Sequence, residues 1–166
     1  YAAVPLGNAA SVALVDLQNM TVPRYFTFAS GNATGSAFVD DTTIIATNPT
    51  LNTVGRMTVG QTSDVITPTV TVAPQPTDVE FGGGRALVTS SNLDANFAPL
   101  GNGIVTALDP RTLQVLGTAQ TGGTNPTAAA VGPDGLLYVV NTGDYVAQGS
   151  VTIVNPATMT AVATVG

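Results

Sequence analysis

The chain has 166 residues, of which 44% are apolar and only 8% charged, enough for one domain with a buried core. Four arginines and no lysine stand against ten acidic residues, for a net charge of −6, which argues against nucleic-acid binding because phosphate neutralisation needs clustered basic side chains. The lack of His and Cys excludes Ser-His-Asp and Cys-His nucleophiles and zinc sites built from Cys and His.

The chain divides into four units in sequence order. Residues 1–30 form a partial unit, because residues 1–4 align with residues 138–141 in the second strand of the last unit. The first unit is therefore expected to contain strands two to four only. Three complete four-stranded units are expected to follow, at residues 31–73, 74–120 and 121–166. Units of this length are typical of propeller blades.

A repeated segment defines these units. Residues 126–141 match residues 76–91 without a gap, 50 residues apart, and residues 38–48 repeat the second half of the pattern. Each unit also has a turn before its last strand, and the turns are 45, 48 and 46 residues apart, at Asp16, Gln61, Asp109 and Asn155. A short polar side chain at such a position hydrogen-bonds its own turn, so we interpret these residues as structural.

The last unit has the residue pattern of four strands and of no helix. Apolar segments at residues 128–131, 136–140 and 151–154 are separated by turn residues, and residues 159–165 largely alternate apolar with polar side chains. A continuous apolar second strand indicates that both of its faces are covered, whereas an alternating strand indicates one face in water. This change, from a second strand covered on both faces to an outer strand with one face in water, favours a propeller over a sandwich.

The sequence therefore predicts an all-β fold, a β-propeller of which about 3.75 four-stranded blades are present. Propellers of this repeat type are expected to close with about six to eight blades, so the partners would be the remaining blades of a longer chain or another subunit. The other subunit could be another copy of the chain, in a homo-oligomer or filament. A further alternative is a four-bladed ring that lacks one strand. Open ends would leave unpaired edges and apolar faces to be covered.

Residues 137–143, Leu-Tyr-Val-Val-Asn-Thr-Gly, followed by residues 151–155, Val-Thr-Ile-Val-Asn, resemble the YVTN-type propeller repeat. Residues 125–135 are similar to the blade opening of NHL repeats and of gluconolactonase-like propellers. The YVTN resemblance implies a surface protein that serves as a scaffold. The lactonase resemblance implies a divalent cation, held near the propeller axis by Glu, Asp and Asn side chains, and oxygen ligands of that kind suit Ca²⁺.

Two acidic residues form the sharpest candidate site in the sequence. Asp78 and Glu80 flank Val79 in an expected first strand, which is the innermost strand of a blade. Their side chains would then point along or into the axial channel on one side. The alternative interpretation is that they are solvated side chains in a wet channel.

The loops that follow the second strands are the other candidate binding surface. They occupy equivalent places in the repeat and are expected to open on one face of the propeller, where a ring of such loops would bind Ca²⁺, a sugar or a peptide. Ordinary turns use the same residue types, which is the alternative. The candidate ligand-binding residues of these loops are Asp94, Asn96, Asn141, Asp144 and Tyr145, and the aromatic candidates for anchoring a partner are Phe97 and Tyr145.

Several features of the sequence favour a location outside the cell. A surface made soluble by Thr, Asn, Ser and Gln is commoner in exported proteins, and Asn19-Met-Thr21 and Asn32-Ala-Thr34 are glycosylation sequons. The longest apolar run, residues 136–140, is far shorter than the roughly 20 residues that span a membrane. The chain opens at Tyr1 without a charged and apolar leader, so any signal peptide is expected to lie outside this sequence.

Two functions remain open from the sequence. The first is a non-catalytic extracellular or cell-surface propeller that serves as a structural or binding scaffold for proteins or glycans. The alternative is a lactonase-like hydrolase with a Ca²⁺-type site on the propeller axis, and it is supported by fold analogy alone. The scaffold needs no cofactor, and catalytic residues cannot be assigned for the hydrolase. Neither function involves nucleic acid or a membrane span.

Overall fold

The computed structural model describes residues 1–144, 146 and 148–166. Over these residues the chain forms fifteen strands and no helix, which confirms the prediction of an all-β fold. The described part therefore holds no helix that has the length and apolarity to cross a membrane. The strands form four antiparallel sheets, one of three strands and three of four.

Each sheet is a meander, because every strand pairs with the next strand in sequence. The first sheet consists of β1 (Ala2–Pro5), β2 (Ser11–Asp16) and β3 (Thr21–Thr27). The second consists of β4 (Ser36–Phe38), β5 (Thr43–Asn48), β6 (Thr53–Thr58) and β7 (Thr69–Thr71). The third consists of β8 (Pro76–Gly82), β9 (Arg85–Ser90), β10 (Ile104–Leu108) and β11 (Val115–Gln120). The fourth consists of β12 (Pro126–Val131), β13 (Leu137–Asn141), β14 (Ser150–Asn155) and β15 (Thr160–Val165).

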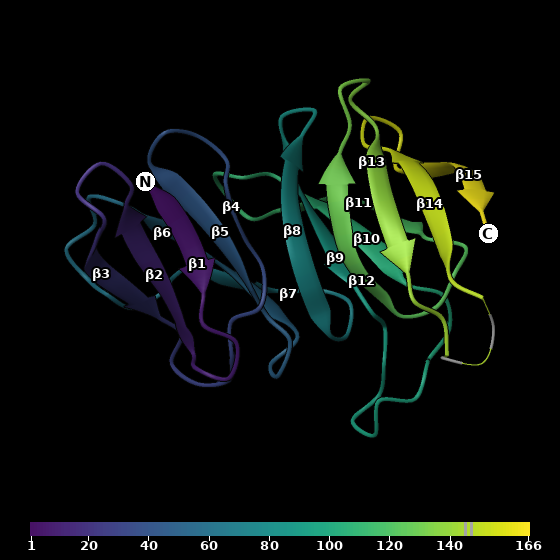
Figure 1. Cartoon of the computed structure of the whole chain (residues 1–166), viewed down its shortest axis with the longest axis horizontal. Helices are drawn as coiled ribbons and strands as arrows, with labels where there is room; N and C mark the ends of the chain where they lie inside the picture. Colours follow the sequence, from purple (N-terminus) through teal and green to yellow (C-terminus); the bar gives the residue numbers. More distant parts are fainter. Residues whose placement is uncertain (145, 147) are drawn as a thin grey trace.

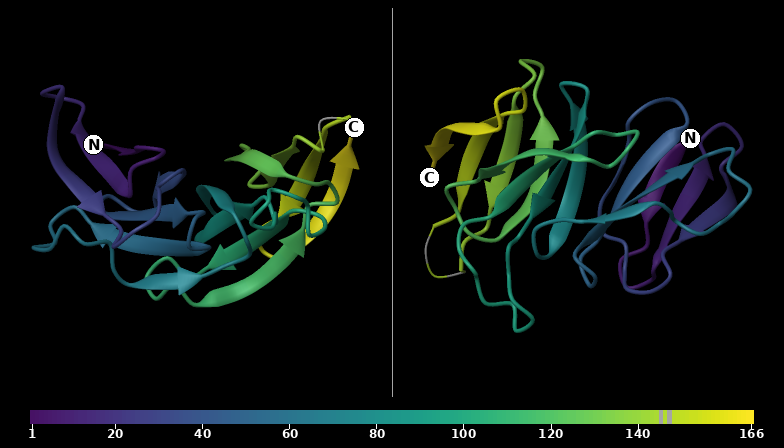
Figure 2. Two further views of the ribbon diagram at one scale, coloured as in Figure 1. Left: turned by 90° about the horizontal axis from the view of Figure 1, so that it is seen from below. Right: turned by 180° about the vertical axis from the view of Figure 1, so that it is seen from behind.

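The four sheets pack face to face in a curved row (Figures 1 and 2). The first strands of the three complete sheets, β4, β8 and β12, contact one another in turn, and β1 contacts β4. The left view of Figure 2 shows the curvature, with the two termini at opposite ends of the row. The first and fourth sheets therefore each pack against one neighbouring sheet, while the second and third pack against two.

The core is divided into three layers, one in each gap between sheets. Phe26 and Ile44 are buried between the first and second sheets, and Ile45 between the second and third. Leu87 and Leu137 fill the gap between the third and fourth. Full burial of a side chain of this size contributes about 1.5–3 kcal/mol, so the inter-sheet contacts are a main source of stability.

The turn between the third and fourth strands has the same hydrogen bonds in three sheets. The side-chain oxygen of Asp16, Asp109 or Asn155 accepts the backbone N–H groups two and three residues further on, at 2.9 to 3.4 Å. The N–H groups of Thr112 and Arg111 lower the pKa of the Asp109 carboxyl. The structural interpretation of this turn position is therefore confirmed. In the second sheet the Gln61 side chain instead accepts the N–H of Thr58, at 2.8 Å.

The ungapped match of residues 126–141 to residues 76–91 is wrong by one residue after the hairpin that joins the first two strands of each sheet. Phe81 pairs with Ala86 across the β8–β9 hairpin, whereas Val131 pairs with Leu137 across the β12–β13 hairpin. The first hairpin closes on two glycines, Gly83 and Gly84, both with positive φ, as a tight two-residue turn requires. Pro133 lies in the longer turn of the second hairpin. Leu137 therefore corresponds to Ala86, and the ungapped alignment fails from the second strand onward.

Candidate functional site

The two acidic residues on β8 face the gap between the third and fourth sheets. Asp78 accepts the N–H of Ala129 in β12 on one carboxylate oxygen and the N–H of Val79 on the other, both at 2.9 Å. Glu80 follows two residues later in the same strand, so its side chain lies on the same face. Both side chains are half-buried, and the structure brings the two predicted residues together.

Burial dominates the electrostatics of this pair. It raises the pKa of the Asp78 carboxyl, against the lowering effect of the two N–H groups. Burial also raises the pKa of Glu80, and the neighbouring Asp78 charge raises it further. Both carboxyls therefore take up protons more readily than free carboxyls do.

A buried threonine hydroxyl lies near these two acidic residues. Thr89 lies opposite Asp78 on β9, is fully buried, and its Oγ1 has no hydrogen-bond partner among the described residues. Calcium takes six to eight oxygen ligands, and nowhere in the described part of the chain do three acidic side chains gather. A cation held by Asp78 and Glu80 would thus take most of its ligands from backbone, water or another molecule.

The loop that follows β9, residues 91–103, is a small hairpin held by its own polar groups. One oxygen of Asp94 accepts the N–H groups of Asn96 and Ala98, both at 2.8 Å. Leu93 and Pro99 form an isolated bridge across the loop. Phe97 is 70% exposed, with a φ of 63°. The two predicted residues Asp94 and Asn96 are thus hydrogen-bonded within this loop, and the side chain of Phe97 is exposed to solvent.

The loop that follows β13 leaves the same end of the molecule as residues 91–103 (Figure 1). Asn141 is buried, and its amide donates to the hydroxyls of Ser150 and Thr152 at 3.1 and 3.0 Å, so this residue faces the interior. Asp144 is exposed and accepts the N–H of Val146 at 3.0 Å. The predicted aromatic of this loop, Tyr145, lies outside the described residues.

The two sequons differ in their surroundings. Asn19 lies exposed in the turn between β2 and β3, and its amide donates to Asp16 at 2.9 Å. Asn32 is partly buried between β3 and β4, and its side-chain oxygen accepts the N–H and the hydroxyl of Thr50 at 3.2 and 2.6 Å. Asn19 is therefore the more accessible of the two asparagines for attachment of a glycan.

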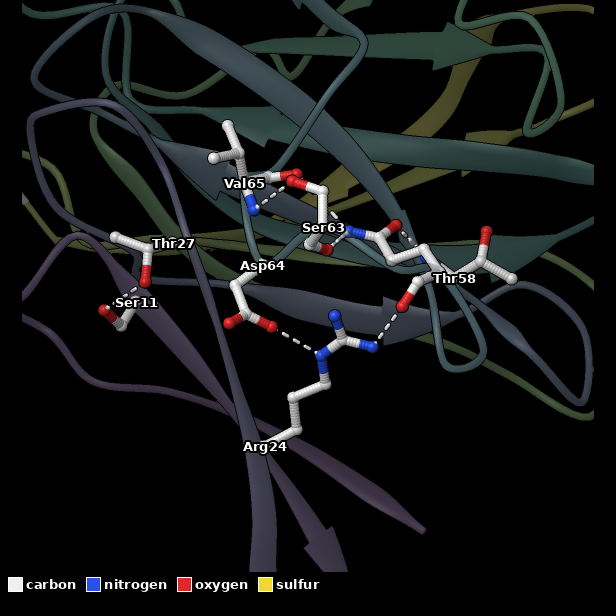
Figure 3. Close-up of polar contacts among 8 residues, drawn as sticks. Ser11, Arg24, Thr27, Thr58, Ser63, Asp64 and Val65 are labelled. Carbon is white, nitrogen blue, oxygen red and sulfur yellow. Dashed lines mark hydrogen bonds and ion pairs between the residues drawn. The ribbon is translucent and has the colours of Figure 1, made fainter.

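A contact between the first and second sheets was not predicted from the sequence (Figure 3). Arg24 donates through Nε to a carboxylate oxygen of Asp64 at 2.6 Å and through another guanidinium nitrogen to the carbonyl oxygen of Gln61. Its guanidinium lies 4.9 Å from the ring centre of Phe26. Its partners lie 37 and 40 residues away in sequence, so no local pattern could have revealed this contact.

Two hollows also escaped the sequence analysis. One, of about 510 Å³, lies on the outer side of the fourth sheet, where Val140, Val151 and Val165 supply its apolar lining. The other, of about 380 Å³, lies between the second and third sheets beside Phe81 and Arg111. The apolar residues that line the first hollow could be identified in the sequence, but only the packing of the sheets shows that no other described sheet covers it.

Comparison with known proteins gives a fold and no family. No protein-family model and no curated protein matches the chain. Similar folds occur in 301 chains of solved structures, so the fold is common. One is from hydrazine synthase of Kuenenia stuttgartiensis, with a TM-score of 0.80 and 18% sequence identity, over 94% of this chain and 43% of that chain. The chain thus spans less than half the length of that solved chain, and likeness at this identity shows the fold alone.

Proposed function

We propose that these residues belong to a β-propeller of about six to eight blades that acts outside the cell or at its surface as a non-catalytic binding scaffold. The observation that carries this proposal is the curved row of sheets, in which the loops after β9 and β13 leave the same end (Figures 1 and 2). A rigid set of sheets that holds loops at one end is a common way to build a recognition surface.

The loops at this end present apolar side chains to solvent. Phe97 and Leu100 in the first loop and Val146 in the second are exposed, whereas the polar groups of Asp94 are used to hold its loop together. Exposed apolar and aromatic side chains on loops at one end of a molecule favour contact with a protein or a glycan. This arrangement supports recognition through the loop tips.

The scaffold proposal is tested by binding to panels of immobilised glycans and of peptides. We expect binding without turnover, and the change Phe97→Ser should weaken it about tenfold or more, about 1.4 kcal/mol, through the loss of an aromatic anchor. Val115→Ser is the matched control, because Val115 is an exposed apolar residue on the outer strand β11. Binding that Phe97→Ser leaves unchanged would contradict recognition through this loop.

The lactonase alternative rests on a separate observation, the half-buried Asp78 and Glu80 beside the unpaired Thr89 hydroxyl. Hydrolysis of a panel of lactones, measured with and without added CaCl₂, distinguishes the two functions. The scaffold predicts rates equal to those in buffer alone. Calcium-dependent hydrolysis that Glu80→Gln abolishes would instead establish the enzyme.

A further inference from the structure

A contact between the third and fourth sheets shows how this fold seats a guanidinium group. Arg85, the first residue of β9, donates through Nη1 to the carbonyl oxygen of Pro156 at 2.8 Å. Pro156 is buried in the turn between β14 and β15. A Cβ built on Gly83 in the β8–β9 hairpin would be 3.6 Å from Cβ of Pro156. The hairpin of the third sheet thus contacts the turn of the fourth, and the Arg85 guanidinium bonds the two sheets.

The equivalent place between the second and third sheets is the hollow of about 380 Å³. Thr43 stands at the position of Arg85, because each is the first residue of the second strand after its hairpin. Pro110, which lines the hollow, stands at the position of Pro156 but is only partly buried. The Thr43 side chain is much shorter than that of Arg85, and no described residue donates to the Pro110 carbonyl oxygen. The hollow therefore has the acceptor without the guanidinium.

Two carboxylates line the hollow at positions where the gap between the third and fourth sheets has neutral residues. Asp109 corresponds to Asn155, the turn residue of the fourth sheet. Asp40 corresponds to Gly83, because each follows the last paired residue of the first strand at the hairpin. One gap thus combines a cation with two neutral residues, and the other combines two anions with the neutral Thr43. The charges of the hollow are complementary to a guanidinium group.

Both carboxylates are ionised at neutral pH. Oδ1 of Asp40 accepts the N–H groups of Thr42 and Thr43 at 2.8 and 2.7 Å, and these bonds lower the pKa of Asp40 to about 2. The N–H of Thr112 likewise lowers the pKa of Asp109. A carboxylate offers about four acceptor sites, so each of the two can accept further donors from a ligand.

Phe81 and Arg111 complete the polar and aromatic lining. Phe81 of β8 is 39% exposed and stands at the position of Val131 in the fourth sheet. The face of an aromatic ring attracts a cation, which a valine does not. Arg111 is exposed and forms no ion pair with any described residue. Two carboxylates and one guanidinium therefore leave the lining with a net negative charge.

We propose that this hollow binds the guanidinium group of another molecule, either an arginine side chain of a peptide or a small alkylguanidine. The bound group would take the place that Arg85 fills between the third and fourth sheets. A guanidinium group is planar, weakly hydrated and rich in N–H donors, so it suits a carbonyl oxygen, carboxylates and an aromatic ring together. An ammonium group is a strongly hydrated point charge and suits this set less well.

The hollow and the proposed recognition loops lie at opposite ends of the sheets (Figure 1). The hairpins after the first strands and the turns before the last strands form one end, and the loops after β9 and β13 leave the other. The inference therefore goes beyond the scaffold function and does not depend on Phe97. A failure of guanidinium binding would leave the glycan and peptide experiments above unaffected.

The test is a titration of the isotope-labelled chain, followed by the amide chemical shifts in NMR spectra at constant ionic strength. Butylguanidinium and butylammonium are the matched probes, because they have the same charge and the same alkyl chain. Butylguanidinium should produce saturable shifts at residues 40–43 and 109–112 and should bind about fivefold more tightly or better than butylammonium. A capped Gly-Arg-Gly peptide separates the two sources. A tighter complex with the peptide indicates a protein partner, and equal affinities indicate a small molecule.

Variants of the two carboxylates locate the binding. Asp40→Asn and Asp109→Asn should each weaken butylguanidinium binding about fivefold or more, because each removes one ionised acceptor. Asp109→Asn should keep its turn, since Asn155 makes the same turn hydrogen bonds in the fourth sheet. Asp41→Asn is the control of equal charge, because Asp41 is exposed next to Asp40 but does not line the hollow. Its affinity should equal that of the natural chain.

Thr43→Arg places the missing guanidinium within the chain itself, as Arg85 does in the next gap, and should abolish binding of butylguanidinium. Circular dichroism checks that each variant folds. Absence of saturable shifts at the two turns with both guanidinium probes overturns the proposal, and so does equal weakening by Asp41→Asn. Binding that appears only after Arg111→Ala also overturns it, because the chain's own Arg111 would then occupy the hollow.

Discussion

Glu80 carries a charge that the fold disfavours. Burial and the neighbouring Asp78 raise its pKa, so the ionised carboxylate is less stable in the folded chain than in the unfolded one. The free energy of unfolding should therefore fall as the pH rises through the folded-state pKa. Glu80→Gln should raise the unfolding free energy at pH 7 by about 0.5 kcal/mol or less, because solvent screens a half-buried group.

Urea denaturation of both chains at several pH values measures this difference. The gain should disappear below about pH 3.5, where the natural carboxyl is protonated in both the folded and the unfolded states. A gain that stays constant from acid to neutral pH would show that the glutamine packs better, and that ionisation plays no part.

Single residues could be predicted where their role is local. Asp16 and Asp109 were interpreted as turn residues because a short side chain reaches its own backbone, and the hydrogen bonds confirm this. Asn141 has the same residue type as the exposed loop amides, yet it is buried. Its position depends on Ser150 and Thr152 in the next strand, which the sequence does not place beside it.

At the level of the elements, a close approach between the first and second sheets depends on a glycine. A Cβ on Gly55 in β6 would collide with Cγ2 of Ile66 and lie 2.7 Å from Cε1 of Phe28, both of which are buried. Gly55→Ala should therefore lower the unfolding free energy by about 1–3 kcal/mol. Thermal and urea denaturation measure this loss.

Gly60 provides the matched control for this substitution. A Cβ at Gly60 would meet no atom within 4 Å, and its φ is not in the left-handed region. Gly60→Ala should therefore change the unfolding free energy by about 0.5 kcal/mol or less. Equal losses in the two variants would mean that the collision in the sheet interface is not the cause.

Most strands could be predicted because apolar segments between turn residues mark them directly. Residues 128–131 and 151–154 lie within β12 and β14. The register could not be predicted as well, because a match of apolar residues tolerates a shift of one position, whereas a shift of one reverses which side of the sheet each side chain occupies. The pairing of Val131 with Leu137 settles the register of β13.

At the level of the whole molecule, the packing of the sheets decides which apolar side chains are buried. Leu113 and Met159 occupy equivalent turn positions and are 3% and 8% exposed in the gaps between sheets. Met20, four residues after the equivalent Asp16, is 78% exposed. The sequence environments of the three are alike, so the sequence could not distinguish them. For the same reason the sequence did not reveal the hollow beside Val140 and Val165.

The central claim, that loops at one end of the row of sheets form a recognition surface, is tested most directly by binding at the exposed Phe97. The account predicts that a glycan or peptide selected from the panels binds the unsubstituted chain without turnover. Phe97→Ser should weaken this binding about tenfold or more, whereas Val115→Ser should leave it unchanged.

Isothermal titration calorimetry of the three chains with the selected glycan or peptide gives the dissociation constants. We expect the dissociation constant of Phe97→Ser to rise about tenfold or more and that of Val115→Ser to equal the value of the unsubstituted chain. Equal dissociation constants for all three chains would contradict recognition through the loop that carries Phe97.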